Sequence, residues 1–240
     1  MISESIFRFR AGDVELDGRI SIPPGAAQGC VICHPHPLYG GDMNNSVVVA
    51  VAGALAAAGV ATLRFDFRGV GRSGGSHGGG APEVEDARAA VDALAAATGL
   101  TSVAIAGYSF GSLIALRVAA AGAGVAATAA GIPMAGVAAA AAGIPMAGVA
   151  AAAAGNPLAG VAAIAPPLAM FDASFVRRLS VPLLLLSGDR DAYCPKADFE
   201  ALTVPAGATV MLLADADHFF VSSEREVADA VVRWSEGLAG

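Results

Sequence analysis

The chain has 240 residues, a formal net charge of −7 and a hydrophobic fraction of 55%. This length suits one α/β domain and is short for two, so we predict a single domain over residues 1–240. The acidic balance excludes the class of nucleic-acid-binding proteins, because no stripe of lysine or arginine is present to neutralise phosphates.

The N-terminal residues and the cysteines bear on the cellular location and on the state of the thiols. Met1–Arg8 lacks a basic start followed by an apolar core, so no signal peptide is visible and a cytoplasmic location is expected. Cys30 and Cys33 lie in an apolar segment, where a strand would point their side chains to opposite faces. We therefore expect free thiols here, not a disulfide or a zinc site.

Apolar segments and Ala-rich helical segments alternate along the chain, which predicts a doubly wound, mostly parallel sheet with flanking helices. The predicted strands are an antiparallel pair near residues 5–10 and 14–22, followed by Gly29–Cys33, Val60–Phe65, Thr101–Ala106, a strand within 155–166, Val181–Leu186 and Ala208–Leu213. The predicted helices are Asn45–Ala58, Pro82–Ala97 and a last one from about Ser222 to Leu238.

Gly107-Tyr108-Ser109-Phe110-Gly111 stands where a predicted strand gives way to a helix. This is the G-x-S-x-G nucleophile elbow, in which a serine hydroxyl is held on a sharp, strained turn. Glycines two places on either side let the chain fold back without collision. The Phe110 amide then lies at a helix N-terminus, where it favours a developing negative charge and predicts one half of an oxyanion hole.

A nucleophilic serine needs a base, and the base needs a carboxylate to orient it. His218 follows the predicted strand Ala208–Leu213, and Asp189 and Asp191 both follow the strand Val181–Leu186. A further acid, Asp217, adjoins the histidine. The order Ser, Asp, His is typical of this elbow, and strand ends place the three groups along one edge of the sheet.

From about Val14 to its C-terminus the chain resembles the α/β-hydrolase superfamily. Within it, His34–Gly41, which begins His-Pro-His-Pro, and Arg64–Gly71 look like small, lidless bacterial hydrolases related to dienelactone hydrolase. The resemblance implies Asp191 as the acid, since the family's turn reads Gly-x-x-Asp and then x-x-x-Pro. Asp189 stays the competitor, and Asp217 is expected to be a turn or supporting residue.

The loop His34–Gly41 is where the resemblance places the second oxyanion donor. Pro35 and Pro37 have no N–H, so the donor stands elsewhere; Leu38 is expected, with His36 as the alternative. A metal site at the two histidines is disfavoured because no carboxylate is arranged around them. We expect neither a metal nor another cofactor.

The segment Arg64–Gly71 lacks the Lys-Ser/Thr end of a phosphate loop, so a structural turn is expected. We expect Arg68 or Asp66 to form a buried ion pair and His77 to be solvated. The stretch between Ala165 and Val181 is too short for a long lid, so short acyl chains should fit best. Expected pocket walls, each equally credible as core, are His36, Tyr39, Tyr108, Leu168, Met170, Phe171 and Phe219.

Twelve residues, Gly131–Ala142, recur without change at 143–154, and a looser copy begins at Gly155. We predict a repeat-derived insertion over 119–154, with one or two short helices, at the sheet edge opposite the active site. Its apolar composition favours a homo-oligomer contact. A membrane span is disfavoured because a proline returns every twelve residues and Lys/Arg flanks are missing.

These observations predict a serine hydrolase that cleaves small carboxylic esters through an acyl-enzyme. A thioesterase or acyltransferase would use the same triad, and a peptidase is a further alternative. An alternative outside the enzymes is a non-catalytic assembly module that associates through the repeat.

Overall fold

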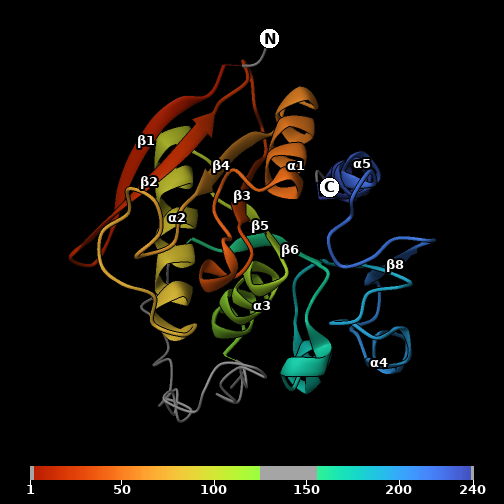
Figure 1. Cartoon of the computed structure of the whole chain (residues 1–240). Coiled ribbons are helices and arrows are strands. Elements are labelled where there is room, and N and C mark those ends of the chain that lie inside the picture. The colour runs from red at the N-terminus through yellow and green to blue at the C-terminus, as the bar shows by residue number, and fades with distance from the viewer. Residues whose placement is uncertain (1–2, 125–155, 239–240) are drawn as a thin grey trace.

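The structure is a computed structural model, and it describes residues 3–124 and 156–238. Its centre is an eight-stranded sheet in the order β1-β2-β4-β3-β5-β6-β7-β8 (Figure 1). The strands are β1 (Ser5–Ala11), β2 (Val14–Ser21), β3 (Gly29–Cys33), β4 (Ala61–Phe65), β5 (Val103–Tyr108), β6 (Leu158–Ile164), β7 (Leu183–Gly188) and β8 (Thr209–Leu213). Strand β2 runs antiparallel to β1 and β4, and the pairs from β4 through β8 are parallel, so the predicted fold class is confirmed.

The described residues form five α-helices: α1 (Ser46–Ala57), α2 (Ala81–Thr98), α3 (Phe110–Gly122), α4 (Lys196–Ala201) and α5 (Glu224–Glu236). Three short 3₁₀ helices lie in the loops: η1 (Pro37–Tyr39), η2 (Leu168–Met170) and η3 (Ser174–Arg178). Helix α4 and the 3₁₀ helices were not predicted, because they span three to six residues, too few for a periodic pattern.

The side chains of the central strands alternate between two hydrophobic cores. In β3, Val31 and Cys33 join the core under α2 and α3, whereas Cys30 and Ile32 join the core under α1 and α5. Such strands are buried on both faces because right-handed crossovers place helices on both sides of a parallel sheet. The two cysteines are free and face opposite sides, as predicted.

The predicted insertion begins at residue 119, yet α3 continues to Gly122, so its first residues belong to the nucleophile helix. Residues 125–154 of it, with both exact repeat copies, lie outside the described residues, so the insertion and its oligomer contact stay predictions. Over residues 3–124 and 156–238, no helix is both long and apolar enough to cross a membrane.

Candidate active site

Ser109 is the single residue that joins the end of β5 to the start of α3, and its backbone has φ 54° and ψ −116°. A positive φ is costly for a residue with a side chain, and it persists here because the strand and the helix fix the turn on both sides. A Cβ on Gly107 would overlap the Gly111 carbonyl, and a Cβ on Gly111 would overlap the Cys33 carbonyl. Both glycines are therefore required by close backbone approach, which confirms the steric reason predicted for them.

Replacing Gly111 by alanine should lower the free energy of unfolding by more than about 2 kcal/mol, because the new methyl group must push the elbow away from β3. Gly53→Ala is the matched control, since Gly53 lies in α1 with open space around its Cβ position. There alanine should stabilise the protein by about 0.5–1 kcal/mol. Urea denaturation of both variants checks the pair, and equal changes would contradict the steric account.

The structure brings together the serine, histidine and aspartate that the sequence singled out. The His218 Nε2 atom lies 2.9 Å from the Ser109 hydroxyl oxygen, and its Nδ1 atom lies 2.8 Å from Oδ2 of Asp191. A proton on Nδ1 satisfies the carboxylate and leaves Nε2 free to accept the serine proton. This geometry is that of a nucleophile, a base and an orienting acid.

The Asp191 carboxylate is buried and bonded on both oxygens. Oδ1 accepts from the amides of Tyr193, at 2.8 Å, and Cys194, at 3.0 Å, while Oδ2 accepts from the Ser187 hydroxyl at 3.2 Å as well as from His218. Burial alone raises the pKa of Asp191, but its hydrogen bonds to His218 and the two amides outweigh burial and hold the pKa below its usual value. The group is therefore a carboxylate at neutral pH.

The competing acids are placed differently. Within the described ranges no hydrogen bond or ion pair joins Asp189 to His218, and Asp217 instead accepts from the Phe219 amide at 2.9 Å in a local turn. Asp217 thus has the turn role that the resemblance implied for it. The His218 carbonyl accepts from the Tyr108 hydroxyl at 2.8 Å, so Tyr108 helps to fix the backbone of the loop that carries His218.

The sequence predicts two main-chain amides for an oxyanion hole, and the His36 ring packs 4.8 Å from the Phe110 ring, so the two segments that carry them are neighbours. The Phe110 amide opens α3, as predicted. The Leu38 amide, the expected second donor, already donates to Nδ1 of His36 at 3.2 Å within η1. The amide of His36, the alternative, has no hydrogen bond to any other described residue.

The imidazole of His34 fixes the peptide that carries this His36 amide. Nδ1 of His34 lies 2.6 Å from the Pro35 carbonyl oxygen, and Nε2 accepts from the Phe67 amide at 3.0 Å. One ring nitrogen must donate and the other must accept, so the ring is neutral with its proton on Nδ1. Because the N–H of a trans peptide points opposite to its carbonyl, the His36 N–H is directed away from His34. The sequence contains no local signal for this long-range contact.

Burial lowers the pKa of His34 to about 4 in the folded protein, against about 6.5 in an unfolded chain. Between these values the unfolded chain binds the proton and the folded protein does not, so stability is full above pH 6.5 and falls as the pH drops to 4. Over that window the free energy of unfolding should decrease by about 3 kcal/mol on account of this group. Denaturant melts of wild type and His34→Gln at several pH values check this, and a difference between them that does not change with pH would contradict it.

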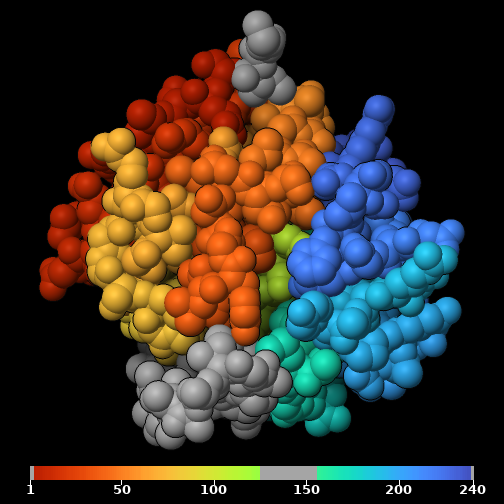
Figure 2. Space-filling model, viewed as in Figure 1, coloured from red at the N-terminus to blue at the C-terminus, as the bar shows by residue number. Residues whose placement is uncertain are grey.

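The predicted pocket residues divide between a rim and the core. Tyr39 and Phe219 are strongly exposed, with Tyr39 packed on the His36 ring and Phe219 edge-on to the His218 ring. Tyr108 is only 3% exposed and belongs to the core. Met170 is half-buried in η2. Figure 2 shows a recess between the orange N-terminal segment and the blue C-terminal segment, with green residues at its floor.

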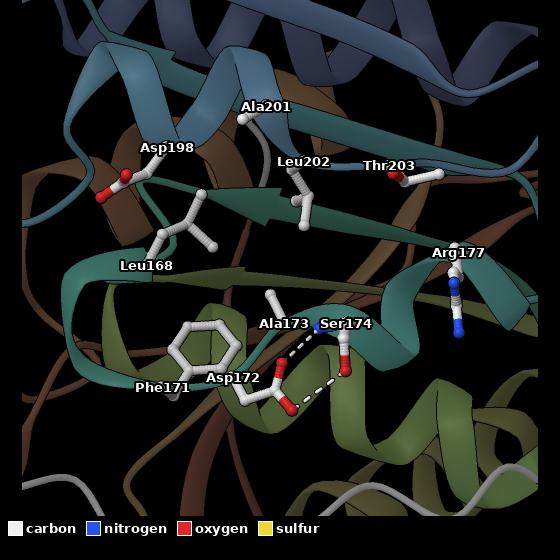
Figure 3. A pocket seen from close by; sticks show the side chains of 10 residues that line it. All are labelled: Leu168, Phe171, Asp172, Ala173, Ser174, Arg177, Asp198, Ala201, Leu202 and Thr203. Carbon is white, nitrogen blue, oxygen red and sulfur yellow. Dashed lines mark hydrogen bonds between the residues drawn. The ribbon is translucent and has the colours of Figure 1, made fainter.

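A separate open pocket of about 370 Å³ lies between η2, η3 and α4 (Figure 3). Ser109, Asp191 and His218 do not line it. Two expected pocket walls, Leu168 and Phe171, line this groove; its other residues are Asp172, Ala173, Ser174, Arg177, Asp198, Ala201, Leu202 and Thr203.

Arg68 and His77 both contact acidic side chains. Arg68 pairs at 2.7 Å with the buried carboxylate of Asp86, so the predicted buried ion pair belongs to Arg68. His77 was expected to be solvated, and this is wrong: its side chain is largely buried, with Nδ1 2.9 Å from Oε1 of Glu83. No group of three or more histidine, cysteine or acidic residues is arranged to hold a metal ion in the part of the chain that the structure describes.

Known proteins resemble this chain in sequence and in fold. The model of the family described as "Serine aminopeptidase, S33" matches residues 31–166, which is more than half of the chain. An α/β serine hydrolase homologue from Coxiella burnetii superposes with a TM-score of 0.73 at 29% identity, covering 97% of this chain and 98% of that one.

Two further relatives extend over nearly the whole chain. A Xanthomonas campestris protein described as an α/β serine hydrolase without a lid has a TM-score of 0.73 at 26% identity, with 98% and 94% of the two chains covered. The uncharacterized protein RP471 of Rickettsia prowazekii is 28% identical over 236 residues, with 93% of this chain and 85% of the relative covered. The resemblance to small bacterial α/β-hydrolases is thereby confirmed. The chain belongs to the serine aminopeptidase S33 family, within the α/β-hydrolase superfamily.

Proposed function

We propose that this serine hydrolase cleaves small carboxylic esters through a covalent acyl-enzyme on Ser109. The observation that carries the proposal is the continuous hydrogen-bonded line from Ser109 Oγ through both ring nitrogens of His218 to a buried carboxylate on Asp191. A serine hydroxyl is a weak nucleophile by itself, and an adjacent base oriented by an acid is the arrangement that activates it.

In the first half-reaction, Ser109 Oγ bonds to the ester carbonyl carbon while His218 Nε2 takes the serine proton. The carbonyl oxygen becomes an oxyanion, which we place between the amides of Phe110 and His36, since the Leu38 amide is already donated to His36 Nδ1. The carbonyl then re-forms as the C–O bond to the alcohol breaks, and the imidazolium gives its proton to the departing alcohol oxygen. Water repeats the sequence on the acyl-enzyme, and the acid is released.

The site favours short acyl groups. After β6 the chain makes only η2 and η3 before it enters β7, so the described residues of this connection provide no long lid. The exposed aromatic rim of Tyr39 and Phe219 offers apolar contact near the triad without enclosing a long chain. The lidless description of the Xanthomonas campestris relative is in keeping with this.

The test is the hydrolysis of a p-nitrophenyl ester series from acetate to dodecanoate. We expect kcat/KM to be highest for acetate to butanoate and to fall by at least about tenfold towards dodecanoate, because an acyl chain too long for the site holds the ester out of line with Ser109. A maximum at long chains would contradict the proposed substrate size. A matched acyl-thioester series, with and without added alcohol acceptors, separates the thioesterase and acyltransferase alternatives on the same triad.

The family description makes an aminopeptidase a second activity to measure. Such an enzyme needs an acidic group that binds the substrate's free ammonium. Glu83 is a buried carboxylate near the loop His34–Gly41, which we call the oxyanion loop. Each of its oxygens accepts an amide of Gly78 or Gly80, and Nδ1 of His77 lies 2.9 Å from Oε1, so it is not open to a substrate. We therefore expect aminoacyl p-nitroanilides to be turned over far more slowly than p-nitrophenyl acetate.

A further inference from the structure

A buried carboxylate lies behind the oxyanion loop, outside the triad. Glu83 stands in the first turn of α2 and its side chain is fully buried. Oε1 accepts from the Gly78 amide at 2.7 Å, and Oε2 accepts from the Gly80 amide at 2.6 Å. A buried charge is costly unless it is paired and hydrogen-bonded, and the helix N-terminus adds favourable field. Glu83 therefore forms a fixed anchor for the loop that precedes α2.

The anchor holds one imidazole in place. Nδ1 of His77 lies 2.9 Å from Oε1 of Glu83, and the His77 side chain is 14% exposed. Beyond the carboxylate, the His77 ring packs on two rings, with centroids 5.0 Å from His36 and 5.7 Å from Phe110. His77 thus connects a rigid helix start to the two residues whose amides we place at the oxyanion.

His36 is the member of this cluster whose amide we place at the oxyanion. Its ring lies between those of Tyr39, His77 and Phe110, at 4.8–5.2 Å. Its Nδ1 atom accepts the Leu38 amide, which closes η1 and sets the direction of the loop. A shift of this ring would therefore move the loop that carries the His36 amide.

We propose that His77, anchored by Glu83, is a positioning residue that fixes the His36 ring and, through it, the oxyanion loop. This inference rests on the proposed function, because it assigns the His36 amide to the ester oxyanion. A misplacement of about 1 Å in a catalytic group costs up to about a hundredfold in rate, and one oxyanion donor is worth a hundredfold or more. Partial loosening of the loop should thus lower kcat by about tenfold.

Two variants separate the ring from the anchor. In His77→Asn the side-chain amide nitrogen takes the place of Nδ1, so Glu83 keeps a donor while the ring contact with His36 is lost. In His77→Phe the ring stays and the donor is lost. We expect His77→Asn to keep the thermal unfolding midpoint but to lower kcat for p-nitrophenyl acetate about tenfold at nearly constant KM. We expect His77→Phe to lower both the midpoint and kcat, because a ring without the Glu83 contact no longer holds the His36 ring in place.

A boronic acid that forms a tetrahedral adduct on a serine provides an independent readout. Its affinity should fall in His77→Asn in parallel with kcat, because the adduct places an oxygen at the oxyanion position. Ser76→Ala, an exposed neighbour in the same loop, is the control and should match wild type. An unchanged kcat in His77→Asn, or a change confined to KM, would overturn the inference while the proposed function stands. A wild type that neither hydrolyses the esters nor binds the boronic acid would overturn both.

Discussion

Ser109→Ala is expected to lower kcat for p-nitrophenyl acetate by at least about 10⁴-fold. The substitution removes the only atom of this residue that can bond to the carbonyl carbon, and with it the partner of His218 Nε2. Alanine keeps the Cβ of serine, so the strained elbow and the packing of Gly107 and Gly111 stay as they are. Steady-state turnover at saturating ester, together with the thermal unfolding midpoint, measures the effect on a folded protein.

Residual activity of more than about 1% in Ser109→Ala would contradict the assignment and point to another nucleophile. The cysteine closest in sequence to a triad residue is Cys194, three residues after Asp191. It is fully buried, and burial raises its pKa to about 11, so almost no reactive thiolate exists at neutral pH. A Cys194→Ala variant should accordingly retain wild-type turnover.

Asp191→Asn should lower kcat by about 10⁴-fold with little change in KM. The carboxylate accepts four hydrogen bonds, among them one from Nδ1 of His218. An asparagine has one acceptor oxygen and one donor nitrogen. If the asparagine oxygen accepts from the Tyr193 and Cys194 amides, its NH2 group faces Nδ1 of His218. Nδ1 must then be the acceptor, so the ring proton moves to Nε2, and Nε2 can no longer accept the proton of Ser109.

Asp189→Asn is the matched control, because Asp189 lies on the same turn without a described contact to His218. It should keep kcat within about threefold of wild type. A pH profile sharpens the comparison: the rise of kcat/KM with pH that a general base produces should persist in the control and be lost in Asp191→Asn. Loss of activity in the Asp189 variant alone would transfer the role of the acid to that residue.

The sheet and the elbow could be predicted from the sequence because their signals are local. Buried parallel strands appear as short apolar runs, and the glycines around Ser109 mark the turn. The rule that carboxyl ends of parallel strands share one edge then predicted where Asp191 and His218 would lie. The structure places both within hydrogen-bond distance of the expected partners.

The support for the oxyanion loop could not be predicted in this way. His34 reaches the Phe67 amide, and His77 reaches the His36 ring, so each contact joins two loops that are far apart along the chain. Glycine-rich composition made His77 look solvated, whereas its partner Glu83 is three residues after a helix N-cap, at the position where a capping carboxylate is common. The three-residue spacing from Gly80 to Glu83 was therefore the one sequence signal for a buried carboxylate near His77. The sequence likewise gives no sign that the His36 ring accepts the amide of Leu38, the predicted second donor.

Detection of the acyl-enzyme tests the central claim most directly. Wild type should be mixed with p-nitrophenyl acetate, quenched in acid within the first turnovers and digested, and the peptide that contains Ser109 should be weighed by mass spectrometry. The account predicts a gain of one acetyl group on Ser109, formed with a stoichiometric burst of p-nitrophenol and absent from Ser109→Ala. Turnover without any acetylated peptide, or acetylation of another residue that persists in Ser109→Ala, would contradict it.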